Sequence, residues 1–187
     1  MSADEQSDDL LRRAVDVLRS GGVVAHATEG VWGLACDPFD AVAVDRVLDI
    51  KGRDADKGLI VAAGRPEAFA NELESLDDEV ASRVRASWPG AVTWVVPNRR
   101  FPPWITGGRD TVAIRVPGHE QARALADLFG GTLVSTSANR SGVEPARTAQ
   151  AVADALGEAV DFILPGEIGS STGPSRIIDA LNGRTLR

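Results

Sequence analysis

Short apolar runs alternate along this chain with segments whose apolar residues recur at helical spacing. Between Leu11 and Leu18, apolar residues fall at positions i, i+3, i+4 and i+7, and Gly21-Gly22 follows them. This pattern is typical of an amphipathic helix that ends at glycine. Residues 23–27 come next and read as a short buried strand. A chain that repeats this alternation is constrained to an α/β fold.

The same pattern predicts the remaining elements. Further helices are expected to begin at Asp40, Pro66, Asp77, His119 and Thr148. Further strands are expected at residues 59–62, 92–96, 111–116, 133–135 and 162–164. A polar turn is expected at residues 28–33 and a proline loop at 102–108, and the tail from residue 177 reads as a hairpin around Asn182-Gly183. The hairpin and the strands beside the proline loop imply antiparallel pairs, so we expect a twisted, mixed parallel/antiparallel sheet flanked by helices.

Length and composition place limits on the class of protein. The 187 residues correspond to one domain over residues 1–187, with a flexible N-terminus at 1–8. No apolar run reaches membrane-spanning length, and the acidic N-terminus does not resemble a secretion signal. The single Cys36 excludes an internal disulfide and fits a reducing, cytoplasmic location, and we expect it to be a buried structural thiol. A net charge of −7 argues against a protein that coats nucleic acid, but it allows a local basic cleft.

The chain has only two lysines, Lys51 and Lys57, and all its other basic residues besides two histidines are arginines. Both lysines lie with Arg53 in one glycine-containing segment at the end of a predicted helix, which we expect to be a solvent-facing loop. An ammonium is a compact point charge that suits phosphate oxygens, so the segment predicts a phosphate site. The alternative is an ordinary solvated loop in which Asp54 and Asp56 pair locally.

Polar side chains also gather just past a predicted strand, at Ser135, Thr136, Ser137 and Asn139. The sheets of α/β proteins usually place a ligand at such a strand end, where hydroxyls and an amide can bind phosphate, base or ribose. The alternative is a polar turn whose side chains bond their own backbone.

Arg115 is the one charge within an apolar strand, and buried arginine is rare unless it is paired. Its forked donors match a carboxylate, so the partner is either a substrate carboxylate or an internal Asp or Glu. Thr28-Glu29 follows the first strand and could bind a small ligand, and Glu29 could hold a metal or a substrate amine. His26 reads as a core residue and His119 as a helix cap or surface group.

Together these segments resemble the YrdC-like family of threonylcarbamoyl-AMP synthases, in its short single-domain bacterial form. The family pattern runs P-T-E-x-x-[YFW]-G-L, K-x-R-x-x-x-K-[PG]-L, W-P-G-x-[VL]-T, A-[VI]-R and S-x-N, followed by a late serine motif. The matching segments here are residues 27–34, 51–59, 88–93, 113–115, 137–139 and 174–178. Two departures are Ala27 and Asp54, which stand where proline is usual.

The resemblance implies a reaction in which L-threonine, bicarbonate and ATP give threonylcarbamoyl-AMP and pyrophosphate, with Mg²⁺ as cofactor. The product would feed the modification of a tRNA adenosine beside the anticodon through downstream transferase proteins, with a weak tRNA contact as a further expectation. Lys51 and Arg53 would be catalytic. The resemblance further implies ATP-binding and threonine-binding sets: Lys51, Arg53, Lys57, Thr111, Ser137 and Asn139 for ATP, and Thr28, Arg115, Ser135 and Ser175 for threonine.

Two other functions remain open from the residues themselves. A non-enzymatic RNA-binding module would use the same cationic cleft on an RNA backbone, although the net charge predicts weak binding with a small salt dependence. A carbamoyl-adenylate transfer to an acceptor other than threonine would use the same site, because Arg115 favours an amino-acid acceptor without specifying which one.

Overall fold

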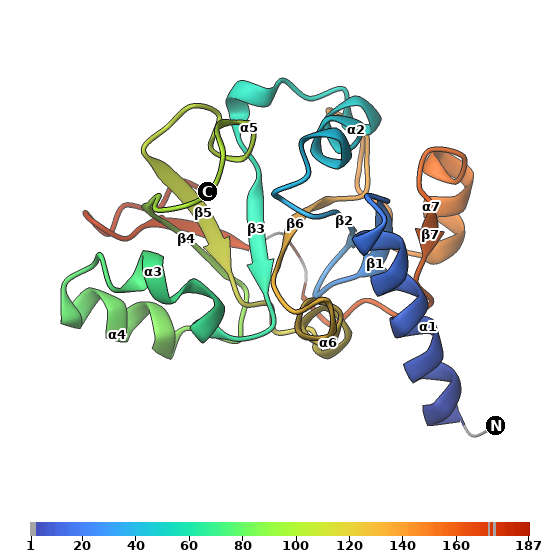
Figure 1. Cartoon of the computed structure of the whole chain (residues 1–187), viewed down its shortest axis with the longest axis horizontal. Coiled ribbons are helices and arrows are strands. Elements are labelled where there is room, and N and C mark those ends of the chain that lie inside the picture. Colours follow the sequence, from blue (N-terminus) through green and yellow to red (C-terminus); the bar gives the residue numbers. More distant parts are fainter. Residues whose placement is uncertain (1–2, 172, 174) are drawn as a thin grey trace.

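Helices and strands alternate along the chain as the apolar pattern predicts (Figure 1). The computed structural model describes residues 3–171, 173 and 175–187. The α-helices within that part are α1 (Ala3–Arg19), α2 (Ala41–Lys51), α3 (Ala70–Leu73), α4 (Asp78–Ala86), α5 (Pro103–Thr106), α6 (Glu120–Phe129) and α7 (Ala149–Leu156). Two 3-10 segments, η1 (Ala55–Lys57) and η2 (Pro66–Phe69), complete the helical elements there.

The described strands form one mixed sheet in the order β7-β1-β2-β6-β3-β5-β4-β8. They are β1 (Val24–Ala27), β2 (Trp32–Ala35), β3 (Ile60–Ala63), β4 (Val92–Pro97), β5 (Thr111–Arg115), β6 (Thr132–Ser137), β7 (Phe162–Ile163) and β8 (Arg176–Asp179). The pairs β1–β7, β3–β5 and β4–β8 are parallel, and the other neighbours are antiparallel. The predicted fold class, an α/β protein with a mixed sheet, is therefore confirmed.

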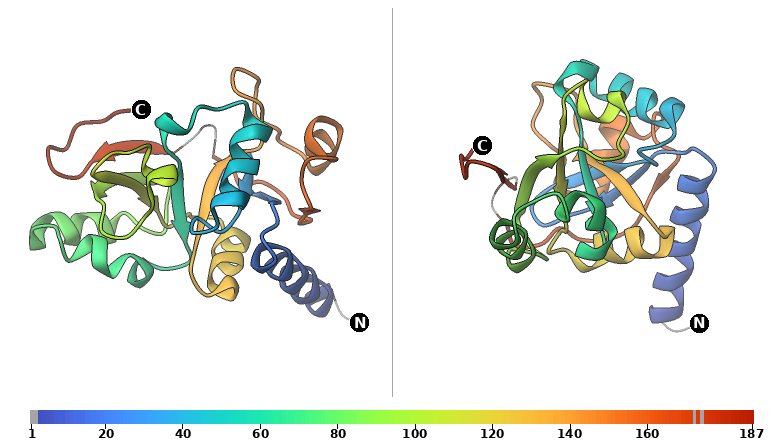
Figure 2. Two further views of the ribbon diagram at one scale, coloured as in Figure 1. Left: turned by 45° about the horizontal axis from the view of Figure 1, so that its top comes forward. Right: turned by 60° about the vertical axis from the view of Figure 1, so that its left-hand side comes forward.

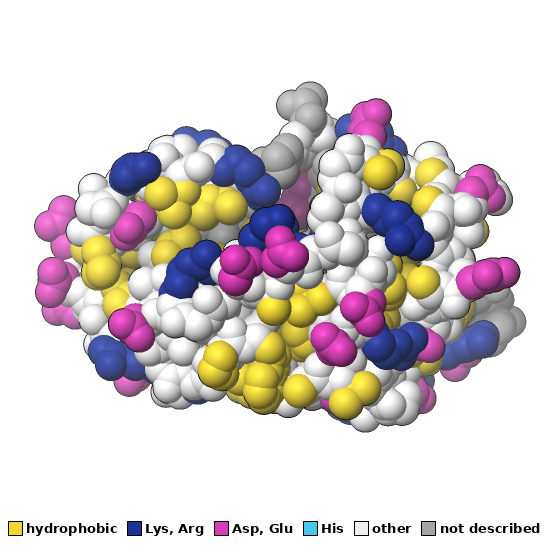
Figure 3. All heavy atoms as spheres, turned by 90° about the horizontal axis from the view of Figure 1, so that it is seen from above, with side chains coloured by type: hydrophobic (Ala, Val, Ile, Leu, Met, Phe, Trp, Pro, Cys, Tyr) yellow, Lys and Arg dark blue, Asp and Glu magenta, His cyan; other side chains and the backbone are white. Residues whose placement is uncertain are grey.

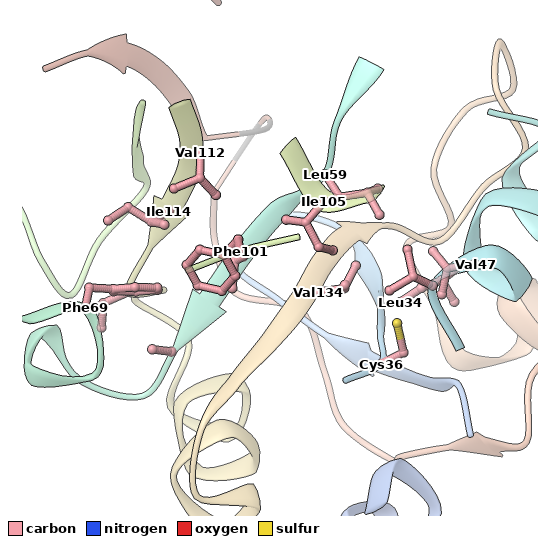
Figure 4. Close-up of a cluster of buried hydrophobic side chains, with 14 of the residues drawn as sticks. Leu34, Cys36, Val47, Leu59, Phe69, Phe101, Ile105, Val112, Ile114 and Val134 are labelled. Atoms are coloured by element: carbon pink, nitrogen blue, oxygen red, sulfur yellow. The ribbon is translucent and has the colours of Figure 1, made fainter. Parts of the chain in front are cut away.

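Buried aliphatic side chains fill the space between the sheet and its helices. Asp40 is the N-cap of helix α2, and its carboxylate accepts from the backbone N–H groups of Val42 and Ala43. The helix packs Val47 into the main core. Figure 4 shows Val47 beside Leu34 and Cys36 in this core. On the other side, α1 packs against α6 around a second, smaller core (Figure 2).

Residues 3–8 lie within α1, and their expected flexibility stays a prediction. Two local predictions differ from the structure. The expected turn at 28–33 is shorter, because Trp32 and Gly33 already pair with β1 as part of β2. The proline loop contains the short helix α5. The predicted tail hairpin is present: Asp179 N–H donates to the Arg184 oxygen at 2.9 Å and Leu186 N–H to the Ile177 oxygen at 2.7 Å, on either side of the bridge between Ile178 and Thr185. In addition, β8 pairs in parallel with β4.

Candidate active site

Every residue predicted for the ATP and threonine sites lines one cavity of about 660 Å³. The cavity collects side chains from the ends of α2, β5 and β6, from η1, from the turn after β1 and from the segment before β8. In Figure 1 the starts of β3 and β5 and the end of β6 meet at the upper edge of the sheet, beside α2 and α5. Figure 3, viewed from above, shows Lys and Arg side chains gathered on this hollowed face. Pro174 of the late serine motif lies outside the described residues.

Lys51 is the last residue of α2, and its side chain reaches into the turn after β6. Its ammonium donates to the backbone oxygens of Ser137 at 2.6 Å and Asn139 at 3.0 Å, and to Asn139 Oδ1 at 3.2 Å. With 3% of its surface exposed, Lys51 does not belong to a solvent-facing loop, so that prediction is wrong. Burial, with Arg53 nearby, lowers the pKa of Lys51 to about 8.

The turn that Lys51 contacts is held by its own polar side chains. Ser137 Oγ donates to Asn139 Oδ1 at 2.5 Å, and Asn139 Nδ2 donates to the backbone oxygens of Arg140 at 3.0 Å and Val143 at 2.6 Å. The backbone-bonded polar turn is therefore present, and it forms part of the cavity wall together with Ser135 and Thr136. The two interpretations of this segment are compatible, because the turn presents its side chains to the cavity.

The other two cations of the lysine segment differ: Arg53 is held by a backbone carbonyl, and Lys57 is largely exposed. Arg53 donates from Nη2 to the backbone oxygen of Gly58 at 3.0 Å, while its Nε is buried without a partner among the described residues. Lys57 pairs with Asp54 at 3.2 Å, and 54% of its side chain is exposed. The local pairing proposed as an alternative thus holds for Lys57, although Lys57 also lines the cavity.

Arg115 faces the cavity because Ile114 and Val116, its strand neighbours, are fully buried in the core on the opposite face. Its Nη2 donates to Oε1 of Glu29, so the internal acid is the partner that the structure shows. The same Oε1 accepts from the backbone N–H of Gly118 at 2.8 Å.

The other residues predicted to bind threonine line the same cavity as this pair. Thr28 Oγ1 donates to the backbone oxygen of Val31 at 2.7 Å, which fixes the turn after β1. Ser175 is buried and its hydroxyl lies 2.8 Å from that of Thr93. Thr111, predicted for the ATP site, lines the cavity from the start of β5.

Two cavity cations were missed in the sequence. Arg109 follows the glycines of the proline loop and donates to the backbone oxygen of Thr106 at 3.1 Å. Arg187 donates to the backbone oxygen of Ser175 at 3.3 Å, and burial, followed by the charges of Arg115 and Arg53, lowers its pKa. The paired glycines before Arg109 were a usable signal for a loop that approaches the site, whereas nothing local marked Arg187.

The remaining titratable residues singled out in the sequence take structural roles. His26 is buried, and burial lowers its pKa to about 4, so its ring is neutral at physiological pH. His119 caps α6 through Nδ1, which accepts from the backbone N–H of Ala122 at 3.4 Å. Cys36 is buried, and burial raises the pKa of its thiol far above the ordinary value. Across the described residues, no group of three or more His, Cys, Asp or Glu side chains could hold a metal ion.

The geometry defines an α/β protein with a cationic, hydroxyl-lined cavity suited to anionic substrates. The Sua5/YciO/YrdC family model, described under the heading telomere recombination, matches residues 16–187, and the chain belongs to this family. Within the described part of the chain, no helix is both long and apolar enough to span a membrane.

Two curated relatives and one solved structure illustrate the similarity. A threonylcarbamoyl-AMP synthase of Halorhodospira halophila is 48% identical over 95% of this chain and 93% of its own length. One of Nitrosococcus oceani is 44% identical over 95% of this chain and 96% of its own. The crystal structure of P. abyssi Sua5 complexed with L-threonine superimposes with a TM-score of 0.88 at 34% identity over 95% of this chain. This chain spans about half of that longer protein, 53% of its length.

Proposed function

We propose that this protein is a threonylcarbamoyl-AMP synthase that forms threonylcarbamoyl-AMP and pyrophosphate from L-threonine, bicarbonate and ATP. The observation that carries the proposal is the convergence of the predicted ATP and threonine residues on one cavity. The names of the curated relatives support the same activity. In this role the protein is a nucleotidyltransferase, because it moves the adenylyl group of ATP to the carbamate oxygen of N-carboxy-threonine.

The chemistry requires two anions to be held together. The amine of threonine and bicarbonate combine to a carbamate with loss of water, and a carbamate oxygen then attacks the α-phosphorus while pyrophosphate leaves. Positioning and charge neutralisation supply most of the acceleration of such a step. Arg53 and Lys57 would face the phosphates, with Thr111, Ser137 and Asn139 at the nucleotide.

At the other end of the cavity, Arg115 would hold the threonine carboxylate between Thr28, Ser135 and Ser175. Lys51 would act on the nucleotide through the turn it holds, because its donors already reach the oxygens of Ser137 and Asn139. Mg²⁺ enters the proposal only as the ion that accompanies ATP. Such ions are commonly held by substrate phosphates with few protein ligands, and no step depends on it here.

The product is an activated carbamate, so it must be consumed by a transferase, and we include the modification of tRNA adenosine beside the anticodon in the proposal. A weak contact with tRNA and a cytoplasmic location belong to the same proposal.

Pyrophosphate release tests this function directly. Purified protein incubated with ATP, Mg²⁺, bicarbonate and threonine should release pyrophosphate, and omission of either threonine or bicarbonate should abolish the release. Equal release without threonine, or with other amino acids in its place, would refute the assignment. Binding of RNA without any pyrophosphate release would favour the RNA-binding module instead.

A further inference from the structure

Glu29 lies where three cavity-forming segments meet. Its carboxylate Oε1 joins Arg115 at the end of β5 to the backbone N–H of Gly118 in the next turn. Its backbone oxygen accepts from the N–H of Ser171 at 3.0 Å, in the segment after β7. A single residue therefore ties together the turn after β1, the β5–α6 turn and the segment after β7.

The packing around Glu29 leaves little room for it to move. A Cβ on Gly169 would come within 2.9 Å of the Glu29 backbone oxygen, and a Cβ on Gly30 would come within 2.9 Å of the Ser171 oxygen. Only 15% of the Glu29 side chain and 10% of the Arg115 side chain are exposed. Because both side chains are largely shielded from solvent, their ion pair strongly constrains the position of the Arg115 guanidinium.

The pair uses only part of the hydrogen-bonding capacity of either residue. Within the described chain, the Arg115 side chain makes one hydrogen bond, through Nη2, and its Nε is buried without a partner. Glu29 Oε2 is likewise buried without a partner among the described residues. An arginine that existed only to pair with this acid would be expected to use two parallel bonds. The single bond instead fixes the guanidinium and leaves donors for another carboxylate.

We propose that Glu29 is a positioning residue for substrate recognition: it orients Arg115 toward the threonine carboxylate. The inference rests on the proposed function and deepens it. Glu29 acts through Oε1 as a hydrogen-bond acceptor, not through contact with the substrate. Its influence should be confined to the threonine end of the cavity, because Lys51, Ser137 and Asn139 make no hydrogen bond to it.

The test compares Glu29→Ala with Glu29→Gln in steady-state pyrophosphate release, varying threonine and ATP separately. Glu29→Ala removes the acceptor, so the KM for threonine should rise at least tenfold while the KM for ATP stays within about threefold. Glu29→Gln keeps an oxygen that can accept from Gly118 and Arg115, so it should restore the KM for threonine to within about fivefold of wild type. Glu120→Ala, an exposed acid at the start of α6, is the matched control and should leave both constants unchanged.

Other outcomes would overturn the inference. Equal threonine defects in Glu29→Ala and Glu29→Gln would show that the charge of Glu29 acts on the substrate amine. Parallel rises in both KM values, with a lower melting temperature, would show general structural damage. Wild-type constants in Glu29→Ala would remove any role for the residue. Wild-type protein that releases no pyrophosphate would instead refute the proposed function itself, and the positioning role with it.

Discussion

Replacement of Lys51 by methionine tests whether this lysine holds the Ser137–Asn139 turn or binds phosphate itself. Methionine keeps the buried stem and removes the ammonium. Two backbone carbonyls, of Ser137 and Asn139, then lose their donor, at about 1–3 kcal/mol each and so about 2–6 kcal/mol together. Against this, the burial that lowers the Lys51 pKa to about 8 from its ordinary 10.5 costs about 3 kcal/mol, which methionine relieves.

The two terms largely cancel, so the global stability of Lys51→Met should lie within about 3 kcal/mol of wild type. The turn itself has lost its support, and we expect turnover to fall by roughly 10²–10³, the usual cost of a displaced binding group. Denaturant unfolding measures the first quantity and pyrophosphate release the second. Hydrogen exchange of the backbone amides at residues 138–143 reports on the turn directly and should become faster.

Lys57→Met is the matched control for folding, because Lys57 is largely exposed and pairs only with the exposed Asp54 among the described residues. Its unfolding free energy should stay within about 0.5 kcal/mol of wild type. A collapse of turnover in Lys51→Met with unchanged exchange at residues 138–143 would show that Lys51 acts on the substrate directly. Wild-type turnover in Lys51→Met would show that Lys51 neither supports the turn for catalysis nor acts on the substrate.

Three further predictions concern other parts of the cavity. Arg115→Lys loses the two parallel donors of the guanidinium, so threonine affinity should fall about tenfold to a hundredfold with little change in ATP affinity. If calorimetric titration shows unchanged threonine affinity and the melting temperature is lowered, Arg115 serves only the structural pair with Glu29. Burial lowers the pKa of Lys51 to about 8, so its ammonium loses a proton as pH rises through about 8, and kcat/KM for ATP should decline over the same range. Lys51→Arg keeps its charge at this pH and should flatten the decline, even if its activity is lower. Gly107 and Gly108 both have a positive φ, of +64° and +76°, which costs an alanine about 1 kcal/mol at either position. Only at Gly107 would an added Cβ also clash, at 2.3 Å from a backbone oxygen of η1, so in denaturant unfolding Gly107→Ala should destabilise by about 3 kcal/mol or more and Gly108→Ala by only about 1 kcal/mol.

The apolar pattern predicts most of the fold because burial of one face imposes a period on the sequence. It failed at Trp32 and Gly33, since β2 is short and lies in the sheet interior, between β1 and β6, where a glycine fits against the oxygen of Thr136. The tail hairpin follows from its turn residues, whereas the additional pairing of β8 with β4, which is distant in sequence, does not. Local turn chemistry carries no information about such a partner.

The sequence predicted a set of residues that line one cavity, but it did not predict their hydrogen-bond and ion-pair partners. Lys51, Arg53 and Arg115 stand out in sequence because their residue types are unusual where they occur. Their partners depend on contacts between segments 86 residues apart, as in the bond from Lys51 to Ser137 and the pair between Glu29 and Arg115. These contacts decide which cation is already engaged and which is available to a ligand.

The distribution of partners explains how a chain with a net charge of −7 can present a cationic cavity. Arg53, Arg109 and Arg187 each donate to a backbone carbonyl, which fixes the side chain without cancelling its charge. A carboxylate partner would fix an arginine equally well but would also neutralise it, as Glu29 does for Arg115. Fixed, uncompensated charges at a partly enclosed site are stronger toward a polyanion than mobile surface charges, because they need no reorganisation when it arrives. In the proposed function, the uncompensated arginines would face the phosphates of ATP, and the compensated one would face the single charge of an amino-acid carboxylate.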